Sequence, residues 1–245
     1  MDFIYSKAPI KEAIIDISII EMDINLEDLE DEILKSLPKD FLDVKKILNF
    51  GGQINIKSRK TPELITSEEV LIGYMFSREN IKVQFRKNGF TINFLSPYTN
   101  WKEFFDISKI FWKKYQEIFK GIKIDNISLR YINEIKIPLP IKNFEDYIVN
   151  IPPIPKCLPQ NYSHFFMQIE VPCENEFVAV ITETTLKQKE KYILPFILDI
   201  NIQKEIKGKI DFEEDFNYMR RLKNLIFEDF ITDNLRKLFT NENRI

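Results

Sequence analysis

The chain has few of the residues from which disulfide frameworks, zinc sites and phosphate-binding loops are built. Its 245 residues include two cysteines, one histidine and six glycines. Cys157 and Cys173 are too few to cross-link a chain of this size, and they lack the CxxC spacing of a zinc site. The scarcity of glycine goes with the absence of a Walker or GxGxxG loop, which weighs against nucleotide hydrolysis. We therefore expect a reducing, cytoplasmic environment and no metal or cofactor.

Long apolar runs are also missing. The run from Ala13 to Ile20 is interrupted by Asp16 and Ser18 and is far shorter than the roughly 20 residues that a membrane-spanning helix needs. The segment from Met1 to Lys11 has no apolar core followed by a small-residue cleavage site, so it does not look like a signal peptide. We expect a protein that does not contact membranes.

Neither sign of charge dominates. The 35 lysines and arginines nearly balance the 38 acidic residues, for a formal net charge of -3. This balance excludes a protein whose whole surface binds phosphate backbones, although a local basic patch remains compatible with it. With 44% hydrophobic and 30% charged residues, the composition is that of a folded chain with one large core or two small ones.

The first half of the sequence alternates strand and helix signals. An isoleucine-rich strand at 10–20 precedes a helix at 25–37, which Asn25 caps and Pro38 ends. A second helix, at about 100–120, carries a broad aromatic stripe. Between the helices the alternation of apolar and polar residues predicts an antiparallel meander, the last turn of which is Lys87-Asn88-Gly89. Its four strands are expected at about 44–57, 64–77, 81–87 and 90–95.

The second half repeats this order in looser form. We expect a long strand at 122–137, a short helix at 143–149, and three or four extended segments within 164–203. A closing helix follows at about 212–239. Thr232-Asp233 interrupts its apolar stripe, and we expect this pair to bend or re-cap the helix.

These elements predict an α+β fold with an internal duplication of strand, helix, antiparallel meander and helix. The halves would be residues 1–122 and 123–245, packed as one continuous unit. This order resembles the TATA-box-binding protein, in which two similar halves form one large antiparallel sheet with helices on one face. Fold does not carry function, so the resemblance implies no DNA bending. Four prolines within 151–160 predict an exposed, semi-rigid loop between the cores.

Three short motifs carry a second resemblance. They are Tyr5-Ser6-Lys7-Ala8-Pro9-Ile10-Lys11-Glu12-Ala13, Leu129-Arg130-Tyr131-Ile132-Asn133 and Phe230-Ile231-Thr232-Asp233-Asn234-Leu235-Arg236. Together they resemble an uncharacterised family of bacterial proteins of about this length that is distributed sporadically among genomes. The resemblance covers the whole chain and implies no activity, cofactor or catalytic residue. The patchy distribution implies horizontal transfer, and with it a role in phage defence or on a mobile element.

One face of the predicted meander is polar. If Ile81, Val83 and Phe85 face the helices, then the opposite face holds eight polar positions, because side chains alternate along a strand. These positions are Gln53, Asn55, Lys57, Lys82, Gln84, Arg86, Thr91 and Asn93. They include three cations and no carboxylate, so we expect a basic face that docks a nucleic-acid backbone or an acidic protein surface. An ordinary solvated face is the alternative, and the lack of interleaved aromatics weighs against single-stranded nucleic acid.

The candidate partner-binding residues are the most polar or cationic members of this face together with one arginine of the second half. Arg130 is expected on the same face, and its planar fork suits a carboxylate or a phosphate. The alternative is a structural ion pair of Arg130 with Glu12 or Glu134. The full set is Lys57, Lys82, Gln84, Arg86, Asn93 and Arg130.

Catalytic readings find less support. Asp125, Glu134 and Lys136 imitate a metal-dependent nuclease, but on one strand the two acids would lie roughly 30 Å apart, too far to share an ion. The single histidine, His164, follows the proline loop near Cys157 and Ser163, without the local sequence of a known nucleophile. We take these residues as structural or surface groups.

The sequence therefore favours a non-enzymatic binding or scaffold protein that docks a protein or nucleic-acid partner through the polar sheet face or the proline loop. No catalytic residue, metal ligand or cofactor is expected. The alternative is a metal-dependent nuclease or other hydrolase using Arg130, Glu134 and Lys136. A small-ligand pocket between sheet and helices is a third reading.

Overall fold

The structure is a computed structural model, and it describes residues 5–41, 43–55, 63–141, 143–158, 162, 164–208 and 210–240. The strands are β1 (Ile10–Ile19), β2 (Asp43–Asn55), β3 (Glu63–Arg78), β4 (Ile81–Arg86), β5 (Gly89–Leu95), β6 (Ile124–Pro138), β7 (Phe166–Pro172), β8 (Phe177–Thr185) and β9 (Ile193–Glu205). The α-helices are α1 (Glu30–Ser36), α2 (Trp101–Ile118), α3 (Phe212–Phe230) and α4 (Asp233–Phe239).

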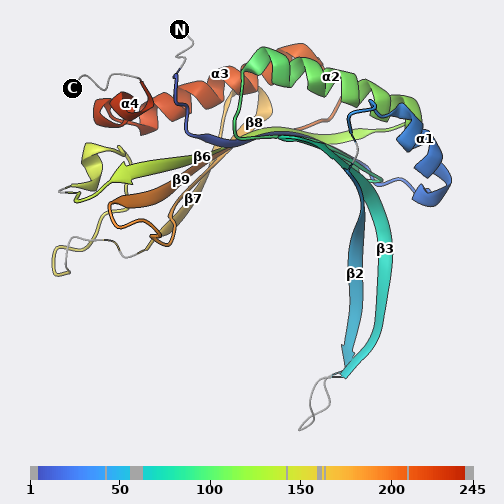
Figure 1. Cartoon of the computed structure of the whole chain (residues 1–245), viewed down its shortest axis with the longest axis horizontal. Helices are drawn as coiled ribbons and strands as arrows, with labels where there is room; N and C mark the ends of the chain where they lie inside the picture. Colours follow the sequence, from blue (N-terminus) through green and yellow to red (C-terminus); the bar gives the residue numbers. More distant parts are fainter. Residues whose placement is uncertain are drawn as a thin grey trace. The chain divides into compact units, whose positions relative to one another are not determined.

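These elements form the predicted α+β fold. The strands make one nine-stranded antiparallel sheet in the order β2-β3-β4-β5-β1-β6-β9-β8-β7. The predicted large sheet with helices on one face is thus confirmed (Figure 1). None of the helices in the described ranges is both long enough and apolar enough to cross a membrane.

Most elements lie where the sequence predicts them, and the differences are at helix ends. The first helix begins as a 3-10 turn at Leu26–Leu29, and the expected helix at 143–149 is only a 3-10 turn at Phe144–Asp146. The closing helix is two helices, because Thr232 leaves the helical conformation and its hydroxyl accepts a hydrogen bond from the Leu235 amide at 3.4 Å. The expected re-capping is therefore confirmed. Residues 151–158 of the proline loop form neither helix nor strand.

The chain contains two compact units. Unit 1 comprises Met1–Ile15, Leu95–Tyr98 and Asn126–Ile245, and unit 2 comprises Asp16–Phe94 and Thr99–Asp125. The order of strand, antiparallel strands and long helix recurs along the chain, with four strands in the first meander and three in the second. The short helix of the first half corresponds only to a 3-10 turn in the second. The expected halves, 1–122 and 123–245, and their origin by duplication stay predictions.

The core of unit 2 is aromatic and lies between β4, β5 and α2. Along β4 the buried residues alternate with partly exposed ones, which leaves Val83 and Phe85 buried. The ring of Phe85 packs edge-on against Tyr115 of α2 and Phe76 of β3, with centroids 5.3 Å and 5.1 Å apart. The Tyr115 hydroxyl donates a hydrogen bond of 2.7 Å to the carbonyl of Arg86. Burial of each such side chain stabilises the unit by about 1.5–3 kcal/mol.

The core of unit 1 lies between α3 and the strands β6, β9 and β8. Leu129 and Tyr131 of β6 pair with Ile202 and Ile200 of β9, and all four side chains are buried. The ammonium of Lys223 on α3 lies 3.9 Å from the centre of the Tyr131 ring. These contacts place α3 on the face of β6 that carries the odd-numbered residues, so the even-numbered side chains of that strand point to the other face.

One ionisable group of this core has no hydrogen-bond partner in the described part of the chain. Glu183 of β8 is fully buried between Met167 and Leu198 on the adjacent strands, on the face that α3 covers. Neither of its carboxylate oxygens accepts a hydrogen bond from a described residue. Burial without a hydrogen-bond donor disfavours the charged form and raises the pKa of Glu183 from 4.5 to about 7.

Glu183 makes the stability of the chain depend on pH. The pKa of Glu183 is higher in the folded state than in the unfolded chain. The stability that protonation of Glu183 contributes is therefore fully present below pH 4.5 and is lost as the pH rises through about 7. We expect Glu183→Gln, which is neutral at every pH, to exceed the wild type in free energy of unfolding at pH 8 by on the order of 3 kcal/mol. The difference should shrink toward pH 4.5.

Urea unfolding between pH 4.5 and pH 8 measures this effect. Glu145→Gln, which changes an exposed glutamate of the same unit, is the control and should show no such trend. A difference between Glu183→Gln and the wild type that stays constant with pH would contradict the assignment.

Candidate functional site

The face of unit 1 opposite α3 is the candidate functional site. Strand register aligns its side chains in rows across β6, β9, β8 and β7. We call the following fifteen positions the open face: Ser128, Arg130, Ile132, Glu134, Ile197, Asp199, Asn201, Gln203, Val178, Val180, Thr182, Thr184, Phe166, Gln168 and Glu170. In Figure 1, α3 and α4 lie on one side of these strands. Within the described part of unit 1, no α-helix covers the open face.

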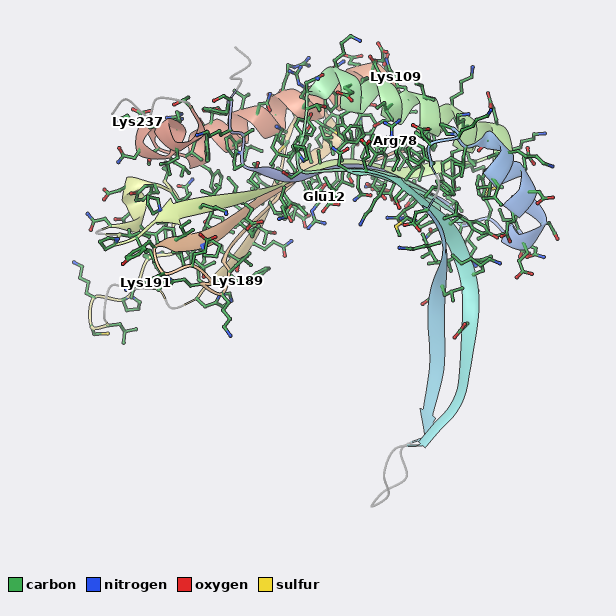
Figure 2. All side chains as sticks on the ribbon, in the orientation of Figure 1. Glu12, Arg78, Lys109, Lys189, Lys191 and Lys237 are labelled. Carbon is green, nitrogen blue, oxygen red and sulfur yellow. The ribbon has the colours of Figure 1, made fainter. Side chains whose placement is uncertain are left out.

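The open face is mixed in charge and is not basic. Among the fifteen positions the only cation is Arg130, and three are carboxylates, on Glu134, Glu170 and Asp199. Lys136 lies on the same side of β6 beyond these rows and pairs with Glu190 at 3.5 Å. Glu12 of β1 adds a further acid on the side of the sheet away from α3 (Figure 2). The expected cationic character therefore does not extend to unit 1, because the neighbouring strands bring acids that lie far from Arg130 in the sequence.

Arg130 forms an ion pair with Asp199. Its Nε lies 2.9 Å and 3.0 Å from the two carboxylate oxygens, and its Nη2 makes a further hydrogen bond to Oδ2. The register sets this geometry: Asp199 lies opposite Ile132, one diagonal step from Arg130. The carboxylate side chain is only 11% exposed and the guanidinium 45%. The alternative named a structural ion pair with Glu12 or Glu134. Asp199 is the residue that accepts these hydrogen bonds, and the negative charge of Glu12 also acts on Arg130. Glu134 pairs with Lys11.

Asp199 also stabilises the charge of the arginine. Its hydrogen bonds and its negative charge raise the pKa of Arg130 above the usual value of an arginine, against the opposing effect of partial burial. The Oδ1 atom of Asn201, directly opposite Arg130 in the sheet, is buried and accepts no hydrogen bond from a described residue. On β6 and β9 the open face therefore combines a strong charge pair with an amide oxygen that accepts no hydrogen bond from a described residue.

The residues of the nuclease alternative belong to separate ion pairs. Glu134 pairs with Lys11 at 3.0 Å, and Lys136 pairs with Glu190 at 3.5 Å. The third member, Asp125, belongs to unit 2. Among the described residues, no group of three or more His, Cys, Asp or Glu side chains is placed to hold a metal ion.

The predicted polar face of unit 2 contains an acid that sequence reasoning overlooked. Arg86 pairs with Asp16 of β1 at 3.0 Å and donates to Thr91 at 2.7 Å and Gln84 at 3.2 Å. Thr91 also donates to Asp16, and Ser18 does so at 3.3 Å. Asp16 is the one charged residue in the isoleucine-rich run from Ala13 to Ile20, and this was the available signal. Arg86 is thus neutralised locally by its structural neighbours.

Five of the six sequence-predicted residues are described, and they belong to two units. Lys82 lies opposite Asn93 of β5 and Ser77 of β3, on the same face of unit 2 as Gln84 and Arg86. Arg130 belongs to unit 1. Lys57 lies outside the described residues, and the side chains of Gln53 and Asn55 are likewise not described.

The single histidine has a structural contact. The Nδ1 atom of His164 lies 3.2 Å from the Thr185 hydroxyl, at the end of β8. Cys157 is exposed and Cys173 partly exposed, and both are free thiols. Ser163 lies outside the described residues. The described contacts therefore connect His164 to the end of β8 and to neither cysteine.

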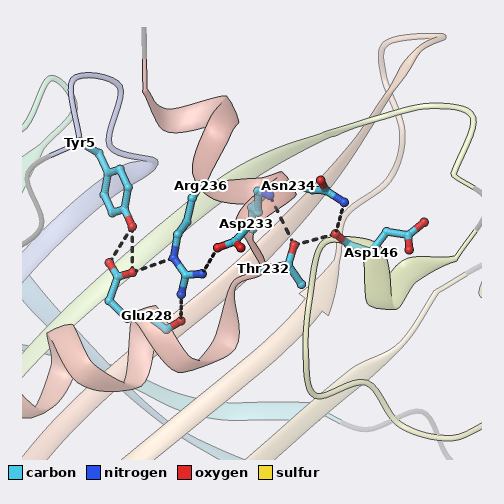
Figure 3. A network of polar contacts seen from close by, with 8 residues as sticks. Tyr5, Asp146, Glu228, Thr232, Asp233, Asn234 and Arg236 are labelled. Carbon is cyan, nitrogen blue, oxygen red and sulfur yellow. Dashed lines mark hydrogen bonds and ion pairs between the residues drawn. The ribbon is translucent and has the colours of Figure 1, made fainter. Parts of the chain in front are cut away.

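The first and last of the sequence motifs meet in a polar network (Figure 3). The hydroxyl of Tyr5 donates to both carboxylate oxygens of Glu228 at 2.8 Å. Arg236 of α4 donates to Glu228 at 3.1 Å and to Asp233 at 2.8 Å. Burial and the nearby Glu228 raise the pKa of Tyr5 to about 12.

The same motif joins α4 to the segment before β7. The Thr232 hydroxyl and the Asn234 amide both donate to the Asp146 carbonyl, at 2.6 Å and 3.1 Å (Figure 3). Near the N-terminus, the Lys7 amide donates to the Phe239 carbonyl at 3.0 Å. These contacts assign the terminal motifs a structural role, which is to fasten α4 and the N-terminal segment to the end of α3.

Comparisons with known proteins do not assign the chain to a family. No protein-family model and no curated protein matches the chain. Membership of the sporadically distributed bacterial family, which the three motifs suggest, therefore stays a prediction. The hydrogen bonds of Tyr5 and Arg236 to Glu228 give these motif residues a structural role whether or not the chain belongs to that family.

The Arg130–Asp199 pair should contribute measurably to stability. Removing the arginine leaves a buried carboxylate without its partner, so we expect a coupling free energy of about 1–2 kcal/mol in a double-mutant cycle of Arg130→Ala and Asp199→Ala. Urea unfolding of the four proteins measures it. The control cycle uses Lys102 and Asp106, an exposed pair on α2 at 2.7 Å, which should show a much smaller coupling. Equal coupling in both cycles would contradict the structural importance of Asp199.

Proposed function

We propose that this chain is a non-enzymatic binding protein that docks a protein partner through the open face of unit 1. The observation that carries the proposal is the combination of an uncovered four-stranded surface with mixed polar, charged and aliphatic side chains. Such a face is either in contact with water or covered by another part of a protein. A face on which hydrogen-bonding groups alternate with aliphatic groups is suited to contact with a macromolecule. The cytoplasm, expected from the two free cysteines, is the proposed location.

The charges of the open face favour a protein over a nucleic acid. A phosphate backbone approaching Arg130 would also approach Asp199, Glu134 and Glu170, and like charges repel. Arg130 is already neutralised by Asp199, so its binding to a phosphate would require breaking a bidentate ion pair. Phe166 is the only aromatic side chain among the fifteen positions, which offers little stacking surface for bases.

The aliphatic residues of the open face also favour a protein partner. Ile132, Ile197, Val178 and Val180 are partly exposed and lie between amide, hydroxyl and carboxylate groups. Docking of a protein surface would remove these side chains from water, while Asn201 and Gln203 offer hydrogen bonds. The buried, unsatisfied Oδ1 of Asn201 gains the most from a donor on the partner.

The hydrolase alternative is less well supported. Glu134 and Lys136, its proposed catalytic groups, are each held by an oppositely charged residue outside the set. Cleavage of RNA or DNA in Mg²⁺ that is abolished by Glu134→Gln would favour this alternative. A role of the partner complex in phage defence follows only from the family resemblance and stays a prediction.

A matched pair of variants tests the open face. Ile132→Lys places a charge on this face directly opposite Asp199, where the lysine stem can still cover the sheet. Leu225→Lys makes the same kind of change on α3, where the side chain is 63% exposed. We expect proteins captured from the native host by the wild type and by Leu225→Lys to be absent with Ile132→Lys, and the purified partner to bind Ile132→Lys at least tenfold more weakly.

Two results would contradict the proposal. One is unchanged binding of the purified partner by Ile132→Lys, and the other is loss of binding with Leu225→Lys alone. Electrophoretic shift of RNA and DNA at low salt is the second measurement, and we expect no shift. Nucleic-acid binding that Ile132→Lys abolishes would assign the face to the other class of partner. Thermal unfolding of both variants confirms that each is folded.

A further inference from the structure

The outer edge of β7 carries an inference that does not rest on the proposed function. It concerns the outward backbone groups of this strand, although the side chains of Phe166, Gln168 and Glu170 also belong to the open face. β7 is the last strand of the sheet, and among the described residues it pairs only with β8. Its residues are exposed throughout, with Met167 alone partly buried. An edge strand presents unpaired amide and carbonyl groups that can pair with another strand.

Hydrogen bonds at both ends of the hairpin show which groups point outward. The Thr185 amide donates to the Phe165 carbonyl at 3.3 Å, and the Cys173 amide donates to the Phe177 carbonyl at 2.7 Å. In an antiparallel pair the hydrogen-bonded positions recur at every second residue. The odd-numbered residues of β7 therefore bond to β8, and the amides of Phe166, Gln168 and Glu170 point away from the sheet.

This edge lacks the usual protection against pairing. Natural edge strands are often shielded by lysine, by proline or by a bulge. β7 contains no lysine, its single proline is the terminal Pro172, and its register with β8 has no shift. Three large apolar side chains are exposed on it: Phe166 at 64%, Ile169 at 40% and Val171 at 41%. Such a strand is suited to pairing with a second strand.

We propose that two copies of this chain dimerise by antiparallel pairing of their β7 strands, with the twofold axis at Ile169. In this register Gln168 of each copy lies opposite Glu170 of the other, and these positions exchange backbone hydrogen bonds. Ile169 lies opposite its own symmetry mate, and Met167 lies opposite Val171. The pairing extends the sheet of each copy into that of the other.

Charge and packing both favour this register. A parallel in-register pairing would set Glu170 beside Glu170, whereas the antiparallel one sets it beside the neutral amide of Gln168. On the face that α3 covers, Met167, Ile169 and Val171 of both copies form one continuous apolar strip. In a single copy Ile169 is 40% and Val171 41% exposed.

Backbone chemistry gives a sharp test of the pairing. Gln168→Pro removes an outward-pointing amide and leaves the hydrogen bonds to β8 intact, and Gln168→Ala is the matched control that keeps the amide. By analytical ultracentrifugation we expect wild type and Gln168→Ala to reach twice the 29.3 kDa of the single chain as concentration rises. Gln168→Pro should stay at the single mass, with unchanged circular dichroism. A weak dimer would still form at about 200 μM protein. A wild type that remains monomeric at this concentration overturns the proposal.

Cysteine cross-linking tests the register. At the twofold axis the two Ile169 positions form a non-hydrogen-bonded pair, in which Cα atoms lie about 4.5 Å apart, within reach of a disulfide. In a Cys157→Ser, Cys173→Ser background, Ile169→Cys should cross-link rapidly in mild oxidant and Val171→Cys slowly. Faster cross-linking of Val171→Cys, or dimers that Gln168→Pro leaves intact, would overturn this pairing. The partner-capture variant Ile132→Lys should not affect either readout, so failure of the two proposals is distinguishable.

Discussion

The structure depends on the two-residue period of the β-strand. In each unit one side of the strands is buried beneath a long helix, so every second side chain must be apolar and its neighbours must face the other way. Phe85 beneath Tyr115 in unit 2 and Tyr131 beneath Lys223 in unit 1 are consequences of this constraint. The open face is the other consequence, since its polar and aliphatic residues are those that the helices leave uncovered.

The same constraint explains why Glu183 stands out. It occupies a position on β8 whose neighbours along the same face, Ile181 and Thr185, are buried beneath the helix side of the sheet. A carboxylate there has lost its water without gaining a donor, and its pKa rises accordingly. Asp199 lies on the adjacent strand and on the opposite face. Its carboxylate is also largely buried, but it accepts hydrogen bonds from two nitrogen atoms of Arg130.

Much of the fold could be predicted from the sequence, because local signals specify it. Alternation in β4 and β5, the aromatic stripe of α2 and the break at Thr232 are all set by residues close together in the chain. The candidate site was predicted less well. Arg86 and Arg130 were recognised as conspicuous cations, but Asp16 and Asp199 lie 70 and 69 positions away from them, and no local pattern shows which strand they will join.

The sequence by itself determined the α+β class, the positions of most strands and helices, and which side chains of each strand share a face. Only the tertiary structure decided which strands are neighbours and in what register. That decision pairs Arg130 with Asp199, divides Glu134 and Lys136 between other partners, and leaves β7 at the edge. The physical reason is that periodicity is a property of one strand, whereas an ion pair or an unprotected edge is a property of the order in which strands assemble.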